Sequence, residues 1–134
     1  TFEELSAIFE AKNIDVENIE CEEEMNDATG AGRGYAVAGG VAGAIEKCIK
    51  EYYPGVEVNI EHCESLSECS KMLMLAKLGK KNGCLIEGMA CPGGCVAGAG
   101  TNIPINKAAG LVKKAVENSA EAVPPKELEE INLD

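Results

Sequence analysis

The feature that most constrains this chain is a short loop, residues 91–95, in which a proline and two glycines separate two cysteines. Proline fixes one backbone torsion and glycine lacks a Cβ atom, so this loop is a defined turn with open space beside its sulfur atoms. Thiolates are the usual ligands of iron–sulfur clusters, and a bulky cluster needs such space. The spacing therefore predicts an iron–sulfur site at Cys91 and Cys95. We expect the backbone N–H groups of Gly93 and Gly94 to be free for the cluster sulfurs.

Two cysteines are too few for a [4Fe–4S] cluster, which takes four protein ligands. The other ligands must come either from the remaining cysteines of this chain, which has seven in all, or from a segment outside it.

The composition predicts a single domain over residues 1–134. With 46% hydrophobic side chains, a chain of 134 residues can bury one core and is too short to suggest two. Aromatic residues make up only 4%, so the core is expected to be aliphatic and lined by cysteines. Seven cysteines placed mostly inside apolar patterns fit a reducing compartment better than a disulfide framework, which makes the cytoplasm the default location.

The net charge of the chain excludes some classes of partner. A net charge of −11 and a pI near 4.6 would repel nucleic acid and anionic membranes, so we expect neither as a partner. No apolar stretch approaches the roughly 20 residues of a membrane span, and no segment reads as a signal peptide.

Hydrophobic spacing predicts several helices. A capping box at Thr1 begins a first helix that continues to about Lys12. Another capping box begins a helix at Ser65, which Gly79 ends, and a further helix begins near Pro104. These helices alternate with candidate strands, as in an α/β fold.

Apolar runs predict strands over residues 14–19, 56–60 and 84–87. Helices between consecutive strands imply a small parallel, or mostly parallel, sheet of three to four strands flanked by helices. The charged residues 22–27 read as a solvated connection, and the acidic residues 124–134 as a flexible tail. The last strand would deliver the cysteine loop to the carboxyl edge of the sheet, where ligand sites of such folds lie.

A glycine-rich segment, residues 30–40, runs directly into a helical pattern. Such a helix N-terminus can bind an anion such as phosphate or a charged cluster. The glycines can also serve only to let helices pack closely. The spacing matches neither a dinucleotide-binding fingerprint nor a P-loop, which disfavours a nucleotide. If the segment lines a cofactor pocket, its first helical turn must face the loop of Cys91, whereas packing alone does not require that orientation.

The other cysteines have simpler explanations. Cys48 and Cys69 fall on apolar helix faces and Cys84 opens a buried strand, so all three are expected in the core. His62 and Cys63 are adjacent in a strand and should point to opposite faces, which disfavours a shared metal. Because the chain has one histidine, a cysteine–histidine hydrolase is also disfavoured.

Two segments resemble the large subunit of the [FeFe]-hydrogenases. Residues 84–100 are similar to the last of three signature segments of that family. Residues 35–44 resemble its Phe-Gly-Val-Thr-Gly-Gly-Val-Met-Glu-Ala segment beside the active-site cluster, with Tyr35 and Ala36 replacing Phe and Gly. The resemblance therefore implies that this chain is one lobe of the iron hydrogenase domain.

That resemblance also implies roles for individual residues. Cys91 and Cys95 would ligate the [4Fe–4S] subcluster, and Cys95 would bridge it to the di-iron centre. Met89 would pack against the di-iron centre, and Tyr35 and Ala36 would lie in the cofactor pocket. The family reaction is the reversible interconversion of protons and electrons with hydrogen.

The family's other ligand segments, one rich in Thr-Ser-Cys-Cys-Pro and one reading Met-Pro-Cys, do not occur here. Because the chain also opens at Thr1 without a methionine, we expect an excised C-terminal portion of a longer protein, inactive by itself and without catalytic residues of its own. The implied partners are the upstream half of the same polypeptide and an electron-carrier protein. The [4Fe–4S] and di-iron cofactors would then be complete only in the parent.

Two other roles for this chain remain open. The residues after the second cysteine, 98–101, depart from the family's Gly-Gly-Gly-Gln-Pro, which favours a divergent branch with a sensory or other non-catalytic iron–sulfur role. Cys91 and Cys95 could also form a thiol-redox or structural zinc module. A redox pair is typically Cys-x-x-Cys, however, and zinc would need two more ligands.

Overall fold

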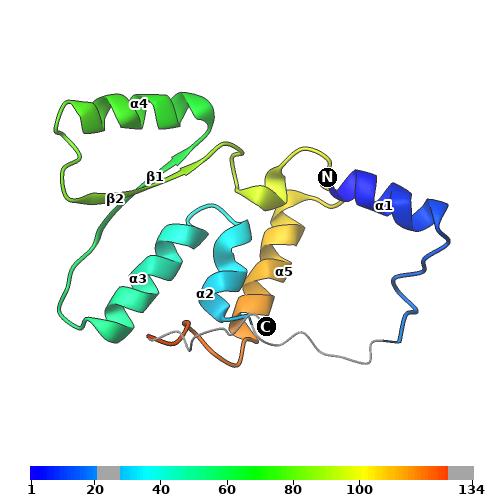
Figure 1. Cartoon of the computed structure of the whole chain (residues 1–134). Coiled ribbons are helices and arrows are strands. Elements are labelled where there is room, and N and C mark those ends of the chain that lie inside the picture. Colours follow the sequence, from blue (N-terminus) through cyan, green and yellow to red (C-terminus); the bar gives the residue numbers. More distant parts are fainter. Residues whose placement is uncertain (21–27, 127–134) are drawn as a thin grey trace, which may run out of the picture.

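The computed structural model describes residues 1–20 and 28–126, and its helices and strands alternate along the chain as in an α/β fold (Figure 1). In chain order the elements are α1 (Phe2–Ala11), α2 (Gly30–Arg33), the 3-10 helix η1 (Gly34–Ala36), α3 (Gly40–Tyr52), β1 (Asn59–Glu64), α4 (Leu66–Lys77), β2 (Cys84–Met89), the 3-10 helix η2 (Cys95–Ala97) and α5 (Ile105–Glu117).

The sheet consists of β1 and β2, which pair in parallel through the crossover helix α4. The register runs from Asn59 opposite Cys84 to Glu64 opposite Met89, so both strands end at the same edge. Helix α4 covers one face, and the N-terminal end of α3 approaches the other (Figure 1). The parallel β–α–β unit expected from the sequence is confirmed.

The sheet is smaller than we expected, because the described residues form two strands instead of three to four. Residues 14–19 form no strand, and a turn at residues 15–18 occupies their middle. In this turn the Asp15 carboxylate accepts hydrogen bonds from the Glu17 N–H group at 3.2 Å and from the Asn18 side chain at 2.6 Å. A short acidic side chain that bonds its own neighbours competes with strand pairing. The second strand begins at Asn59 instead of residue 56, since Val56 donates to the Tyr53 carbonyl in a turn. The expected connection at residues 22–27 and most of the tail lie outside the described residues.

The helix ends follow local signals. Thr1 and Glu4 form the predicted capping box of α1. The Ser65 hydroxyl accepts from the Glu68 N–H group at the start of α4, and Pro104 precedes α5. The Glu68 carboxylate binds the N–H group of Glu64 at 2.8 Å, so it fastens α4 to the end of β1.

Small residues dominate the core. The buried apolar residues are Ala31, Ala42, Ala44, Cys63 and Val96. Helices α2, α3 and α5 pack together around the alanines (Figure 1). Large apolar side chains of α1 and α4 remain exposed, among them Phe2, Ile8, Leu66 and Leu73. Within the described residues, no helix is both long and apolar enough to cross a membrane.

Candidate functional site

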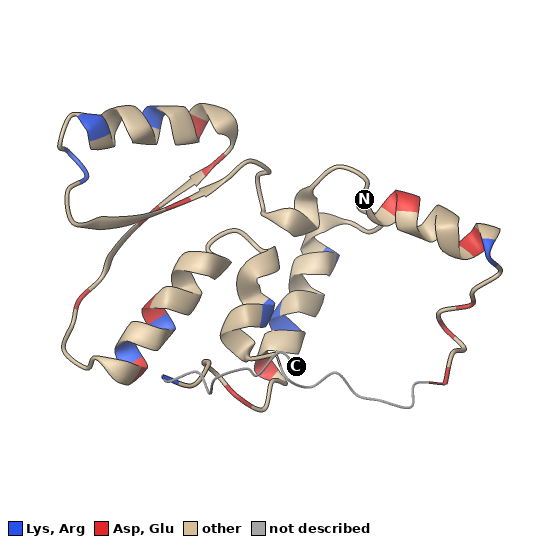
Figure 2. Cartoon of the chain, viewed as in Figure 1, with Lys and Arg blue, Asp and Glu red and all other residues tan. Residues whose placement is uncertain are grey.

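The cysteine loop follows directly from the carboxyl end of β2. Cys95 is exposed and Cys91 is half-buried. The Gly94 N–H group donates to the Cys91 carbonyl at 2.9 Å, which closes the turn between the two cysteines. Residues 88–106 carry no charged side chain, so in a strongly acidic chain the loop lies within an uncharged stretch (Figure 2).

The glycine-rich turn before α3 packs against this loop, backbone to backbone. The Ala38 N–H group donates to the Gly93 carbonyl at 3.2 Å. A Cβ atom on Gly94 would lie 2.5 Å from the Ala38 nitrogen and 2.8 Å from the Ala36 carbonyl oxygen. The glycine-rich turn and the cysteine loop therefore meet, as the cofactor-pocket interpretation requires and packing alone does not.

The N–H groups of the loop glycines are not free, and our expectation for them was wrong. The Gly93 N–H group donates to the Glu64 carboxylate at 2.7 Å, and that of Gly94 to the Cys91 carbonyl. Glu64 can reach Gly93 because it ends β1 beside the end of β2. These two bonds hold the shape of the loop and leave neither group for a cluster sulfur.

The N-terminus of α3 is capped by a carboxylate from the sheet. Glu87, 8% exposed, accepts the N–H groups of Val41 at 2.9 Å and Ala42 at 3.4 Å through one oxygen. Its other oxygen lies 2.9 Å from Nδ1 of His62. Gly39, the N-cap residue, has no side chain for this role. The helix dipole favours an anion here, but the anion is the chain's own Glu87 and not a cluster or phosphate.

We expect Glu87→Ala to lower the free energy of unfolding by roughly 3 kcal/mol, because it removes a helix cap together with the half-buried hydrogen bond to His62. Urea titration measures the loss. The matched control is Glu61→Ala on the neighbouring strand, whose side chain pairs with Lys81 and is 30% exposed, against 6% for Glu87. That pair should contribute at most about 1 kcal/mol, so equal losses in the two variants would contradict the capping role.

His62 and Cys63 point to opposite faces of the sheet, as predicted. His62 binds Glu87 on the face toward α3. Cys63 lies on the face toward α4, where its sulfur is 3.4 Å from that of Cys69. From the sequence we expected Cys69 in the core without a cysteine partner, and Glu87 was not among the predicted site residues. Two features of the sequence could have indicated these contacts. Glu87 is a charged residue inside an apolar strand, and Cys63 and Cys69 flank the predicted capping box of α4.

The other predicted site residues are spread around the loop. Met89 ends β2 and is half-buried, with its carbonyl accepting the Ser65 N–H group at 2.7 Å. Ala36 ends η1 and contributes the carbonyl that lies close to Gly94. The Tyr35 side chain is 48% exposed and lines an apolar pocket with Cys48.

An open pocket of about 280 Å³ adjoins the exposed cysteine. Cys95, Ala99 and Thr101 line one side, and Thr1, Phe2 and Leu5 of the first helix line the other. The Glu3 N–H group donates to the Gly100 carbonyl at 2.9 Å, which keeps the start of α1 beside the loop (Figure 1). The exposed cysteine thus has room beside it.

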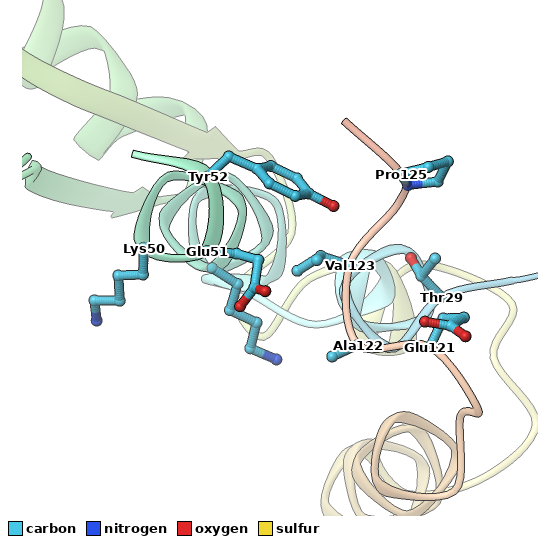
Figure 3. Close-up of a pocket in the computed structure, with 9 residues that line it drawn as sticks. Thr29, Lys50, Glu51, Tyr52, Glu121, Ala122, Val123 and Pro125 are labelled. Carbon is cyan, nitrogen blue, oxygen red and sulfur yellow. The ribbon is translucent and has the colours of Figure 1, made fainter. Parts of the chain in front are cut away.

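A larger pocket lies elsewhere. It has a volume of about 740 Å³ and is open, between the C-terminal end of α3 and residues 121–125 (Figure 3). Its lining combines Lys50, Glu51 and Glu121 with Tyr52, whose hydroxyl donates to the Pro124 carbonyl. It contains no cysteine and is at the opposite end of α3 from the glycine-rich turn, so we assign it no part in the site.

No group of three or more histidine, cysteine or acidic side chains gathers around a common point among residues 1–20 and 28–126. A metal at Cys91 and Cys95 would therefore need ligands beyond those that the described residues bring together.

The fold and the loop define an α/β domain that presents two glycine-spaced cysteines at the carboxyl edge of a parallel β–α–β unit. The model of the family described as iron only hydrogenase large subunit, C-terminal domain, matches residues 1–99. The chain belongs to this family. A comparison with curated proteins found no match. The matched range includes the glycine-rich turn and both loop cysteines, the two segments on which the resemblance was based.

Proposed function

We propose that Cys91 and Cys95 supply two of the four protein ligands of a [4Fe–4S] cluster in a hydrogenase active site. The observation that carries this proposal is the contact of the cysteine loop with the glycine-rich turn, inside the range that matches the family. This contact supports the proposal, because the family resemblance implies that both segments lie beside the cofactor. The donor set fits the group, since two thiols stand in an uncharged loop and one of them is exposed beside an open pocket.

The other roles follow from the same resemblance. Cys95, the exposed ligand, would be shared with the di-iron centre, Met89 would pack beside that centre, and Ala36 would form part of the wall. Tyr35 would contribute to that wall through its backbone, because its side chain lines the pocket with Cys48. When bound, the cofactor supplies the redox chemistry for interconverting protons and electrons with hydrogen. This chain contributes binding and orientation, because Glu64 and the glycine-rich turn hold the loop from two sides.

The missing ligands would come from an upstream half of the same polypeptide, and electrons from a carrier protein. The exposed apolar side chains support a covering partner. Phe2, Leu5 and Ile8 on α1 are 61%, 45% and 56% exposed, although α1 lies beside the loop. Burying such side chains contributes about 1.5–3 kcal/mol each, which is a substantial driving force for association.

The test is anaerobic reconstitution of the 134-residue chain with iron and sulfide, with excess small-molecule thiol to fill the open ligand positions. We expect charge-transfer absorbance in the visible range and bound iron and sulfide in the native chain. Cys91→Ser and Cys95→Ser should each reduce bound iron by at least about tenfold, since each removes a direct ligand.

The matched control is Cys48→Ser, which changes a half-buried cysteine on α3 away from the loop. It should keep iron binding while lowering stability. Equal loss of iron in Cys48→Ser and Cys95→Ser, with both variants folded by circular dichroism, would contradict the ligand assignment. A colourless chain that binds zinc instead would favour the structural zinc module.

A sensory or other non-catalytic role is the second candidate. Residues 98–101 depart from the family's usual sequence after the second cysteine. There Thr101 folds back, and its hydroxyl donates to the Gly98 carbonyl at 3.1 Å. A parent that binds the cluster but turns over no hydrogen would establish this role.

A further inference from the structure

Two thiols outside the proposed cluster site lie close together. Cys63 is buried near the end of β1, and Cys69 is half-buried in the first turn of α4. Their sulfur atoms are 3.4 Å apart. A disulfide bond needs about 2.05 Å, so the sulfurs are little more than 1 Å from bonding distance.

Gly88 of β2 makes room for this pair. It lies opposite Cys63 in the sheet register. A Cβ atom on Gly88 would be 3.1 Å from the Cys69 sulfur and 3.6 Å from the Cys63 sulfur. A larger residue there would press on both thiols, so the absence of a side chain lets the two sulfurs share this position above the strand.

The two thiols differ in their surroundings. The Cys63 sulfur is 3.3 Å from the Glu87 carbonyl, inside the β–α–β unit. Burial raises the pKa of the Cys63 thiol, and the contact with Cys69 raises it further. Because the thiolate is the reactive form, Cys63 is the poorer first nucleophile. Cys69 is the more accessible thiol and the one that an external reagent can reach.

We propose that Cys63 and Cys69 form a reversible dithiol–disulfide site whose oxidant is a low-molecular-weight disulfide. The Cys69 thiolate attacks one sulfur of that disulfide, forms a mixed disulfide and releases one thiolate. Cys63 then loses its proton to the solvent and attacks the Cys69 sulfur, which releases the second thiolate. Two protein thiols are oxidised to one disulfide, and the small disulfide is reduced to two thiols.

This site is independent of the proposed cluster ligands, although it is structurally connected to their loop. The bond would join the first turn of α4 to β1. Glu64 is the residue after Cys63. Its carboxylate accepts the Gly93 N–H group, and its own backbone N–H group donates to the Glu68 carboxylate. Oxidation would therefore stiffen the segment that holds one side of the cysteine loop.

Tryptic mapping tests the proposal directly. Cleavage after Lys50 and Lys71 releases residues 51–71, which contain Cys63 and Cys69 and no other cysteine. Cys84, Cys91 and Cys95 are released together in residues 82–107. The reduced, iron-free full chain is equilibrated under argon with mixtures of oxidised and reduced glutathione, quenched with an alkylating reagent and digested.

We expect residues 51–71 to lose two hydrogen atoms and both alkylation sites. At the same glutathione ratio the disulfide should be favoured at least about tenfold over the urea-unfolded chain, because the fold holds the thiols together. Cys84→Ser should leave this equilibrium unchanged. In Cys69→Ser, Cys63 should remain open to alkylation after unfolding.

Equal oxidation in folded and unfolded chains would overturn the proposal, because closure would then owe nothing to the fold. So would a stable glutathione adduct on Cys69 that does not close onto Cys63. Since the readout needs no iron, failure here and failure of the cluster proposal can be distinguished.

Discussion

Replacing Gly40 by alanine is expected to lower the free energy of unfolding by at least about 4 kcal/mol, the range of the most damaging single substitutions. A Cβ atom at this position would lie 1.9 Å from the Gly34 carbonyl oxygen and 2.7 Å from its carbon. Both are backbone atoms, so no side-chain rotation relieves the overlap. The turn of residues 34–40 would have to open, and with it the start of α3.

Gly43→Ala is the matched control, on the same helix one turn later. A Cβ atom at Gly43 has no neighbour within 4 Å. Alanine is the better helix former, so this variant should be neutral or more stable by up to about 1 kcal/mol. Urea titration of both variants measures the difference. Similar stabilities would mean that the close approach of residues 34 and 40 does not exist in solution.

Gly94→Ala is expected to lower the free energy of unfolding by about 3–4 kcal/mol and to displace the cysteine loop. Gly94 has φ +87° and ψ −162°, a backbone region that is essentially restricted to glycine and costs other residues about 1–3 kcal/mol. A Cβ atom there would also lie 2.5 Å from the Ala38 nitrogen and 2.7 Å from the Val37 carbonyl carbon. Relieving that overlap should cost at least about 2 kcal/mol more.

Gly83→Ala is the control for the cost of placing alanine at a positive φ. Gly83 has φ +76° but no neighbour within 4 Å, so alanine there should cost only about 1–2 kcal/mol. The difference between the two variants reports the contact between the cysteine loop and the glycine-rich turn together with the more restricted backbone region of Gly94. Gly94→Ala should also bind less iron on reconstitution, whereas Gly83→Ala should not. A Gly94 variant no less stable than the Gly83 variant would contradict that contact.

The cysteine loop is held in place by the surrounding chain. It continues directly from β2. Two contacts with the rest of the chain also position it: the hydrogen bond from the Gly93 N–H group to Glu64, and the backbone contact with residues 36–38. A ligand loop held in this way loses little entropy when it binds, which favours affinity. The exposed Cys95 can then remain accessible without the loop being free to rearrange.

Features that depend on residues close together in the sequence were predicted better than features that depend on competing contacts. The capping box of α1 was predicted correctly, because Thr1 and Glu4 meet within one helical turn. At α4 only half of the predicted box forms: Ser65 accepts from the Glu68 N–H group, but the Glu68 carboxylate binds the Glu64 N–H group. The apolar run at residues 84–87 predicted β2, which extends to Met89, and the run at residues 56–60 predicted its parallel partner β1 three residues too early. The strand expected at residues 14–19 was wrong because Asp15 bonds its own neighbours, a competition that hydrophobic spacing does not show.

The sequence by itself determined the helix starts, the parallel β–α–β unit, the cysteine loop and the family. These depend on spacings of a few residues or on segments that are recognisable one at a time. The tertiary structure alone decided which groups the hydrogen-bond donors and thiols contact. Glu87 caps a helix 46 residues away, Gly93 donates to Glu64 across the sheet edge, and Cys63 meets Cys69 above Gly88. Each of these groups has several chemically suitable partners along the chain, and only the folded backbone determines which one comes within bonding distance.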